Sequence, residues 1–216
     1  MPRVVVLGDS LAVSPASQLN FTTELQARAD AAGVRARIAN ASTWGDTTAD
    51  GLRRLDEALA IQPQVLVVAL GANDGLRGVS LPAVERNLTE IIQRAQDRRI
   101  HVLLAGMEAP PVNGFDYSIQ FHLLFPRLAA KHDIPLVPFL LAGVILNPDM
   151  NGPDGIHPNA AGARRIASTV WPYLEPMLRR TVLSLRAGPA HRNLTECSPL
   201  REDICWSAEG YFHPPA

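Results

Sequence analysis

The stretch Val65-Leu66-Val67-Val68-Ala69-Leu70 is apolar at every position. Successive side chains of a β-strand point to opposite faces of its sheet, so a strand that is apolar throughout is expected to be covered on both faces. Sheets of this kind are mostly parallel and carry helices on each side. The stretch therefore predicts a central parallel strand.

Four further short apolar runs predict the remaining strands, and stretches with helical period separate them. The predicted strands are 3–7, 35–39, 65–70, 101–105 and 136–137, and the predicted helices are 17–32, 47–60, 81–98, 118–132 and 159–185. Alternation of short strands with longer helices is typical of parallel βαβ units. The chain is predicted to be an α/β protein with a doubly wound sheet of about five parallel strands.

Length and composition limit the class of protein. A chain of 216 residues with 47% hydrophobic content can bury a full core, and we expect one domain over 1–185. The formal net charge of −1 gives no electrostatic reason to expect binding to nucleic acid or to an anionic membrane surface. No stretch approaches the roughly 18 uninterrupted apolar residues of a membrane span.

The predicted first strand begins by Arg3, which leaves no room for a signal peptide ahead of it. A cytoplasmic protein is therefore expected. A chain from which a leader had been trimmed would instead be periplasmic or secreted.

Beyond residue 185 the helical period is lost, and Gly, Pro, Cys, Trp and His mix without a pattern. We interpret 186–216 as an appendage of unknown role, for which partial disorder is one expectation. It holds both cysteines, Cys197 and Cys205, which could form a disulfide in an oxidising compartment or stay free in the cytoplasm. Its aromatic residues, from Trp206 onward, could fold back on the body or mediate self-association, and the oligomeric state is left open.

A serine and a histidine–aspartate pair follow predicted strands. Ser10 comes just after the first strand, and Asp154 and His157 lie three residues apart in a predicted loop. Ligands of a parallel doubly wound sheet bind beyond the carboxyl ends of its strands. A serine hydroxyl becomes an effective nucleophile when a base takes its proton and a third group orients that base. We predict a serine hydrolase with Ser10 as nucleophile, His157 as general base and Asp154 as the orienting acid.

Structural roles are the alternative for these residues, since Ser10 or Asp154 could simply cap a turn. The other five histidines lack a carboxylate that a tight loop could fold back onto the ring. The body has no cysteine, which excludes a cysteine nucleophile and a zinc–thiolate site there. The absence of a G-x-S-x-G elbow and of nucleotide-binding glycine motifs argues against the larger α/β-hydrolase fold and against nucleotide binding.

Four blocks of sequence resemble the GDSL, or SGNH, hydrolase superfamily, in which successive blocks contribute Ser, Gly, Asn and His. The blocks are Gly8-Asp9-Ser10-Leu11, Asn40-Ala41-Ser42-Thr43-Trp44-Gly45-Asp46-Thr47, Leu70-Gly71-Ala72-Asn73-Asp74-Gly75-Leu76-Arg77-Gly78 and Asp154-Gly155-Ile156-His157-Pro158-Asn159. The chain most resembles the bacterial group of multifunctional acyl-CoA thioesterases, lysophospholipases and arylesterases. The resemblance ends at about residue 185 and implies a three-layer, flavodoxin-like fold, an ester or thioester substrate, and no metal or organic cofactor.

The resemblance also implies an oxyanion hole made of the backbone N–H groups of Ser10 and Gly45 and the side-chain amide of Asn73. Fixed donors stabilise a tetrahedral oxyanion, and loss of one typically slows catalysis by a factor of about 10²–10³. Glycine suits the second position because a side chain could obstruct the approach of the backbone to the substrate. Three supporting residues are expected to order these loops through hydrogen bonds: Asp9, Asn40 and Asp46.

An acyl-binding pocket is predicted from apolar residues in loops that could reach the site, with core packing as the alternative for each of them. The candidates are Leu11, Trp44, Leu76, Met107, Pro110, Phe139, Leu140 and Ile145. By resemblance, the segment from Gly75 to Gly78 is expected to be a mobile loop that closes over the acyl chain, with a glycine hinge at each end.

Two other functions stay open. A carbohydrate O-acetylesterase uses the same four blocks, although a sugar-binding platform should carry more exposed aromatic residues. A catalytically silent acyl-binding module would keep the fold without the chemistry, but every expected catalytic and oxyanion position is intact. The main hypothesis is an esterase that forms an acyl-enzyme with short- to medium-chain acyl and aryl esters, and acyl thioesters and lysophospholipids are further candidate substrates.

Overall fold

The computed structural model of the chain describes residues 1–187. Five parallel strands form one sheet in the order β2-β1-β3-β4-β5. They are β1 (Arg3–Gly8), β2 (Arg37–Asn40), β3 (Val65–Ala69), β4 (His101–Ala105) and β5 (Leu136–Val137). This is the flavodoxin-like strand order, so the predicted doubly wound parallel fold is confirmed. The predicted appendage lies outside the described residues from position 188 onward.

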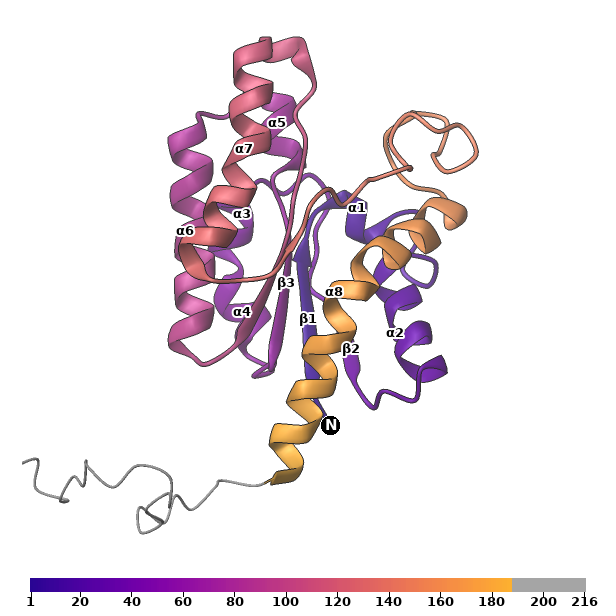
Figure 1. Cartoon of the computed structure of the whole chain (residues 1–216). Coiled ribbons are helices and arrows are strands. Elements are labelled where there is room, and N and C mark those ends of the chain that lie inside the picture. Colours follow the sequence, from indigo (N-terminus) through magenta and orange to yellow (C-terminus); the bar gives the residue numbers. More distant parts are fainter. Residues whose placement is uncertain (188–216) are drawn as a thin grey trace, which may run out of the picture. The chain divides into compact units, whose positions relative to one another are not determined.

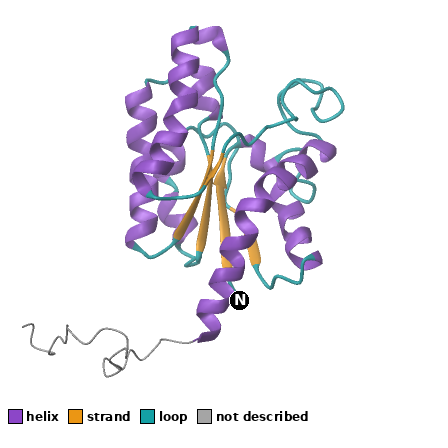
Figure 2. Ribbon diagram, in the orientation of Figure 1, coloured by secondary structure: helices purple, strands orange, loops and turns teal. Residues whose placement is uncertain are grey.

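Helices cover both faces of the sheet (Figure 1, Figure 2). One face carries α2 (Phe21–Ala31) and α8 (Ala160–Ala187), and the other carries α3 (Thr48–Arg53), α4 (Leu55–Leu59), α6 (Leu81–Asp97) and α7 (Phe115–His132). Three short helices complete the described elements: α1 (Ser10–Val13), α5 (Ala72–Arg77) and the 3₁₀ helix η1 (Pro111–Asn113). The helices α1 and α5 start beyond the carboxyl ends of β1 and β3, at the upper edge of the sheet in Figure 1.

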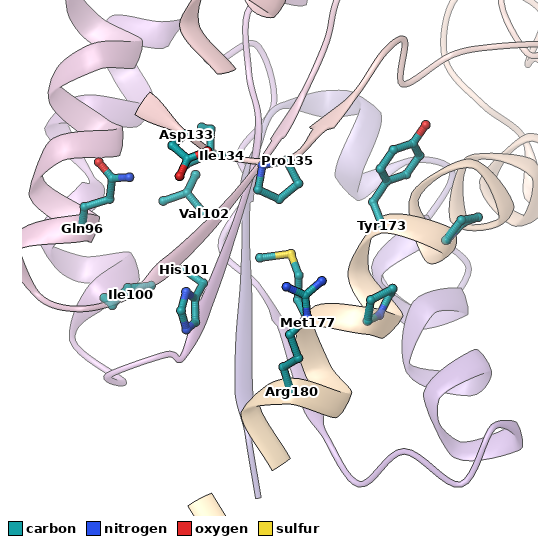
Figure 3. A pocket seen from close by; sticks show the side chains of 12 residues that line it. Gln96, Ile100, His101, Val102, Asp133, Ile134, Pro135, Tyr173, Met177 and Arg180 are labelled. Atoms are coloured by element: carbon teal, nitrogen blue, oxygen red, sulfur yellow. The ribbon is translucent and has the colours of Figure 1, made fainter. Parts of the chain in front are cut away.

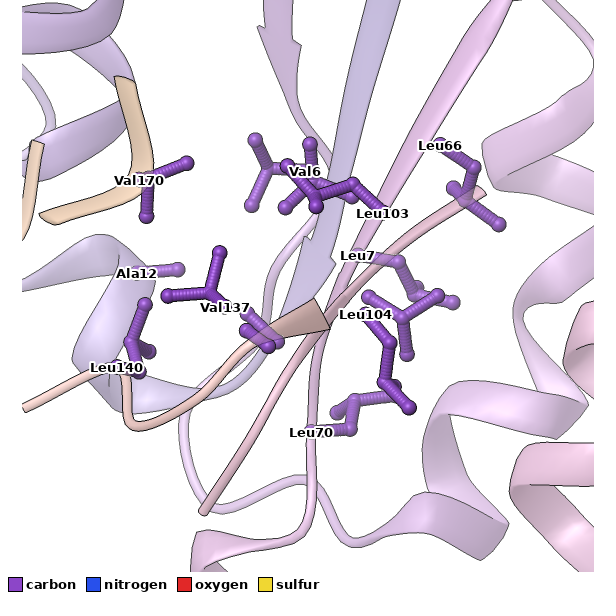
Figure 4. Close-up of a cluster of buried hydrophobic side chains, with 14 of the residues drawn as sticks. Val6, Leu7, Ala12, Leu66, Leu70, Leu103, Leu104, Val137, Leu140 and Val170 are labelled. Atoms are coloured by element: carbon purple, nitrogen blue, oxygen red, sulfur yellow. The ribbon is translucent and has the colours of Figure 1, made fainter. Parts of the chain in front are cut away.

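The core consists of two apolar layers, one on each face of the sheet. All five residues of β3 are buried, and it lies between β1 and β4, which confirms the predicted central strand. In Figure 4, Val6 and Leu103 lie on one side of the strands, and Leu7 and Leu104 on the other. Each such side chain contributes about 1.5–3 kcal/mol when it is fully buried. The strand ends that carry the site are therefore firmly held.

Two helix predictions differ from the structure for local reasons. Helix α2 begins at Phe21 rather than at residue 17 because Asn20 caps it, with its Oδ1 accepting a hydrogen bond from the N–H of Thr23 at 3.0 Å. The predicted helix 47–60 is two helices that meet at Arg54, whose backbone leaves the helical conformation.

The expected mobile loop from Gly75 to Gly78 is mostly helix. A glycine flanks helix α5 at each end: Gly71 precedes it and Gly78 follows it, with positive φ of 118° and 64°. Gly75 lies within the helix and is buried, and a Cβ there would lie 3.0 Å from the Cβ of Ala109. Gly75 is therefore a close-packing position and not the end of a loop.

Gly162, in the first turn of α8, allows that helix to touch the preceding loop. A Cβ on Gly162 would overlap the backbone oxygen of Met150, which cannot swing away as a side chain could. We expect Gly162→Ala to lower the free energy of unfolding by about 1–3 kcal/mol, as overpacking does. Chemical denaturation of the purified variant measures this change.

Gly152→Ala is the matched control, because a Cβ there would meet no atom of the described residues closer than 3.7 Å. We expect it to change the free energy of unfolding by less than about 0.5 kcal/mol. Equal losses in the two variants would contradict the assigned contact.

Candidate active site

Ser10 is the first residue of α1 and lies directly beyond the carboxyl end of β1. The helix begins there because Asp9 caps it. The backbone of Asp9 is extended, and its Oδ1 accepts a hydrogen bond from the N–H of Leu11 at 3.0 Å. The buried strand before Ser10 and the cap at Asp9 together fix where the hydroxyl lies.

His157 and Asp154 lie in the loop before α8, and this loop is folded around the Asp154 carboxylate. Oδ1 of Asp154 accepts hydrogen bonds from the N–H groups of Ile156 and His157, both at 3.0 Å, while Gly155 supplies a φ of 71°. Oδ2 of Asp154 lies 2.5 Å from Nδ1 of His157. Nε2 of His157 lies 2.9 Å from Oγ of Ser10. The three predicted side chains thus form one continuous hydrogen-bonded chain.

The negative charge of Asp154 determines which nitrogen of the His157 ring carries the proton. The hydrogen bond to the His157 ring, followed by those from the N–H groups of Ile156 and His157, lowers the pKa of Asp154 to about 2. The carboxylate is therefore ionised at neutral pH and favours a proton on Nδ1 of His157. Nε2 is then left as an acceptor toward Ser10, as a general base requires.

The loop that carries Gly45 lies near Ser10 because backbone hydrogen bonds hold it to the end of β1. The N–H of Ala41 donates to the oxygen of Val6 at 2.8 Å, and the N–H of Thr43 donates to the oxygen of Gly8 at 3.2 Å. Gly45 then turns the chain with a φ of 74°, which glycine adopts without the steric cost that other residues meet.

Asn73 lies in the first turn of α5, beyond the carboxyl end of β3 and next to the end of β1. Its Nδ2 donates to the backbone oxygen of Asp46 at 2.9 Å and lies 3.5 Å from Oδ2 of Asp9. Asn73 thereby touches both the Ser10 loop and the Gly45 loop. The gap between β1 and β3 is the topological switch point at which open α/β sheets bind ligands.

Two buried carboxylates behind these loops have close hydrogen-bond partners, although burial still raises the pKa of one of them, Asp74. Asp46 pairs with Arg54, whose Nε lies 2.8 Å from its Oδ2. Asp74 accepts hydrogen bonds from the N–H and the Oγ1 of Thr48 at 2.8 and 2.7 Å. Both carboxylates hold loops of the site against helices of the body.

The third buried carboxylate, Asp9, has no cationic partner within the part of the chain that the structure describes. Burial raises the pKa of Asp9 to about 7, although the hydrogen bond from Leu11 opposes the shift. Repulsion from Asp46 and Asp74 raises this pKa further. Keeping Asp9 ionised at neutral pH therefore costs free energy.

Comparison with known protein families agrees with this geometry. The model of the GDSL-like lipase/acylhydrolase family matches residues 6–165, which include all the residues described above. The chain belongs to the GDSL-like lipase/acylhydrolase family.

Relatives of this acylhydrolase are known as esterases. Esterase TesA of Pseudomonas aeruginosa is 39% identical over 178 residues, which cover 81% of this chain and 89% of that protein. Thioesterase 1/protease 1/lysophospholipase L1 of Escherichia coli K12 is 37% identical over 142 residues, 65% of this chain and 68% of that protein. The crystal structure of TesA matches with a TM-score of 0.77 and 38% identity, and covers 81% of this chain and 99% of that one.

These comparisons confirm the predicted superfamily and its thioesterase and lysophospholipase branch. They also confirm the predicted enzyme class, a carboxylic ester hydrolase of the GDSL/SGNH type.

The residues predicted to form the acyl pocket of the acylhydrolase fall into buried, half-buried and exposed groups. Leu11, Met107 and Leu140 are buried in the core, which favours the core-packing alternative for these three. Each comes shortly after a strand, and the sequence does not reveal which side of a loop faces the sheet. Pro110 and Phe139 are half-buried.

The remaining acyl-pocket candidates, Trp44, Leu76 and Ile145, are exposed. The Trp44 ring is 60% exposed, and its centroid lies 4.8 Å from that of the His157 ring. Leu76 is exposed on the helix that carries Asn73, and Ile145 is exposed in the loop region after β5. Ile156, directly before His157, is also exposed and was missed, although its place beside the predicted base was an available signal.

Asn40 and two arginines brace the Gly45 loop of the acylhydrolase. Asn40 donates from Nδ2 to the oxygen of Ala12 at 2.7 Å, and its Oδ1 accepts from the N–H of Ser42 at 3.0 Å. Arg77 donates to the oxygen of Gly45 at 3.1 Å, and Arg54 holds Asp46. Sequence reasoning missed both arginines because nothing in their spacing sets them apart from the others.

A cavity of about 490 Å³ lies at the opposite end of the acylhydrolase sheet. Figure 3 shows His101, at the amino end of β4, together with Tyr173 and Met177 of α8 around it. Ser10 follows the carboxyl end of a strand, so this cavity is distant from the candidate active site.

Two features are absent from residues 1–187 of the acylhydrolase: a membrane-spanning helix and a cluster of metal-ligating side chains. Within this part of the chain, no helix has both the length and the apolar character that a bilayer span requires. No cluster of three or more His, Cys, Asp or Glu side chains suited to a metal ion occurs among the same residues.

Burial of Asp9 predicts a pH-dependent stability. Its pKa is 3.8 ordinarily and about 7 in the folded chain, so between these values the folded chain keeps a proton that the unfolded chain has lost. The free energy of unfolding must therefore fall as pH rises through this window, by about 4 kcal/mol from this group alone. The side chain of Asp9→Asn cannot ionise, so the stability of this variant does not fall with pH for this reason.

We therefore expect the melting temperature of Asp9→Asn, relative to that of the wild type, to be higher at about pH 8 than at about pH 4. Thermal unfolding followed by circular dichroism at both pH values tests this. An offset between the two proteins that is independent of pH would contradict it.

Proposed function

We propose that the chain hydrolyses carboxylic esters through an acyl-enzyme formed on Ser10. The observation that carries the proposal is the hydrogen-bonded chain from Ser10 through His157 to Asp154, with contacts of 2.9 and 2.5 Å. An oriented base within hydrogen-bonding distance of a serine hydroxyl is the arrangement that nucleophilic acyl transfer needs.

In the first half of the reaction, Oγ of Ser10 attacks the carbonyl carbon while Nε2 of His157 takes the hydroxyl proton. Asp154 stabilises the resulting imidazolium. The tetrahedral intermediate then collapses, the bond to the leaving oxygen or sulfur breaks, and His157 gives that atom its proton. In the second half, a water molecule loses a proton to Nε2 of His157 and attacks the acyl carbon; the bond from that carbon to Oγ of Ser10 then breaks, His157 returns the proton to Oγ, and the carboxylic acid leaves.

The oxyanion would accept hydrogen bonds from the N–H groups of Ser10 and Gly45 and from the amide of Asn73. The support for this is positional. Ser10 and Asn73 lie in the first turns of the short helices beyond two neighbouring strands, and hydrogen bonds tie the Gly45 loop to the end of β1. Donors fixed in this way need no reorganisation when negative charge develops.

We propose short- to medium-chain acyl and aryl esters as substrates, with acyl thioesters and lysophospholipids as further candidates. The exposed side chains of Trp44, Leu76 and Ile156 offer apolar surface beside the histidine and the oxyanion donors. The esterase and thioesterase/lysophospholipase names of the relatives point to the same substrate classes. A cytoplasmic location stays a prediction.

The test is hydrolysis of p-nitrophenyl esters from acetyl to palmitoyl, and of palmitoyl-CoA, by the wild type and by Ser10→Ala. We expect the substitution to lower kcat by about 10⁴-fold or more, as removal of a triad nucleophile does. Ser14→Ala is the matched control, because Ser14 caps the end of the same helix and its buried hydroxyl has no hydrogen-bond partner among residues 1–187. It should keep wild-type turnover.

Each other outcome has a defined meaning. Substantial turnover by folded Ser10→Ala would contradict the assigned nucleophile. Activity on acetyl esters alone would favour the carbohydrate O-acetylesterase alternative. A folded wild type that hydrolyses none of these substrates would favour the silent acyl-binding module.

The apolar surface beside His157 is tested by Trp44→Ala. Loss of the ring should raise KM for hexanoyl and longer p-nitrophenyl esters by about tenfold, because less apolar area is buried on binding. Ile61→Ala is the control, since Ile61 is also exposed but lies before the amino end of β3. A uniform effect of Trp44→Ala on acetyl and longer esters would show that the ring does not contact the acyl chain.

A further inference from the structure

The amide of Asn73 is held between two acceptors. Its Nδ2 donates one hydrogen to the backbone oxygen of Asp46 at 2.9 Å. On the same side of the amide, Oδ2 of Asp9 lies 3.5 Å from that nitrogen, at the outer limit of a hydrogen bond. At that distance the hydrogen bond to Asp9 is weak, so the second amide hydrogen can turn to a substrate oxyanion at little cost.

The two acceptors determine the orientation of the Asn73 amide, that is, whether Nδ2 or Oδ1 faces them. Nitrogen and oxygen exchange places when an asparagine amide turns by half a revolution, with little change in shape. In the turned form, Oδ1 of Asn73 would face the oxygen of Asp46 and the carboxylate of Asp9 with no hydrogen between them. Repulsion from the charged carboxylate opposes that form even at 3.5 Å.

The presence of aspartate and not asparagine at position 9 indicates that the negative charge of this residue has a function. As the cap of α1, aspartate has no advantage over asparagine, because the two are equally good N-caps. A buried carboxylate without a cationic partner is the costlier of the two, and the facing carboxylates Asp46 and Asp74 add to that cost. Residues that lower the stability of the fold, and have no structural role to explain their presence, are often functional.

We propose that Asp9 is a positioning residue of the oxyanion hole: its carboxylate keeps the amide of Asn73 turned so that Nδ2, and not Oδ1, faces the reacting carbonyl. Asp9 does not touch the substrate and acts only through Asn73. The proposal rests on the proposed function, in which Asn73 is an oxyanion donor.

Asp9→Asn is the informative substitution. Asparagine keeps an Oδ1 for the N–H of Leu11, so α1 stays capped. Toward Asn73 it replaces an acceptor with an N–H donor, which removes the repulsion against the turned amide. The variant should therefore be at least as stable as the wild type and yet slower.

The experiment is a double-mutant cycle of wild type, Asp9→Asn, Asn73→Ala and the double variant, with p-nitrophenyl butyrate at about pH 9, where Asp9 is ionised. We expect Asn73→Ala to lower kcat by about 10²–10³-fold and Asp9→Asn to lower it by about tenfold, with KM within about twofold. In the Asn73→Ala background, Asp9→Asn should change kcat by less than about twofold, because the group through which it acts is gone.

Asp50→Asn is the matched control for the cycle. Asp50 caps α3 through Thr47, and none of its hydrogen bonds involves Asn73. Its effect on kcat, whatever its size, should be the same in both backgrounds.

Two results would overturn the proposal: an equal loss of kcat on Asp9→Asn in both backgrounds, or no loss in the wild-type background. Neither depends on the nucleophile, which Ser10→Ala tests separately. Failure of the positioning role is thus distinguishable from failure of the proposed esterase mechanism.

Discussion

The pairing of β1 with β3 is the constraint on which the site depends. The two strands run parallel in register from Val4 beside Val65 to Gly8 beside Ala69, and nearly all of their residues are buried. Because both strands end at the same edge, the short helices that follow them start side by side. A slip by one residue would exchange the buried faces of a strand and separate the two helices. The apolar core thus sets the spacing of polar groups that do not themselves contribute to it.

The four carboxylates in and around the site have different environments and different roles. Asp154 is partly exposed, ionised and bonded to the histidine ring, so it orients a base at little cost. Asp46 is buried and pairs with Arg54, whereas Asp74 is buried and accepts hydrogen bonds from Thr48 while burial raises its pKa. Asp9 is buried and, like Asp74, has no cationic partner among the described residues, and burial raises its pKa to about 7. Free energy lost at one carboxyl group is compatible with a stable fold because the core on both faces of the sheet is extensive.

Much of this architecture could be predicted from the sequence because its signals are local. Apolar runs identify strands, and the spacing of Asp154 and His157 allows a turn that folds one onto the other. What could not be predicted depends on three-dimensional context. Helix α5 is too short to show a helical period and contains a glycine. The partnership of Arg54 with Asp46 and the burial of Leu140 are set by how loops fold onto the body, which no spacing in the sequence records.

The central claim is that Ser10 attacks the carbonyl carbon of an ester. A p-nitrophenyl alkylphosphonate mimics that substrate but leaves a stable bond to the attacking atom, so it records which residue reacts. Intact-mass spectrometry followed by peptide mapping of the treated protein is therefore the most direct measurement. The account predicts one phosphonyl group per chain, on Ser10, with activity lost in proportion. A protein that loses activity while Ser10 stays unmodified, or that is labelled at another residue, would contradict it.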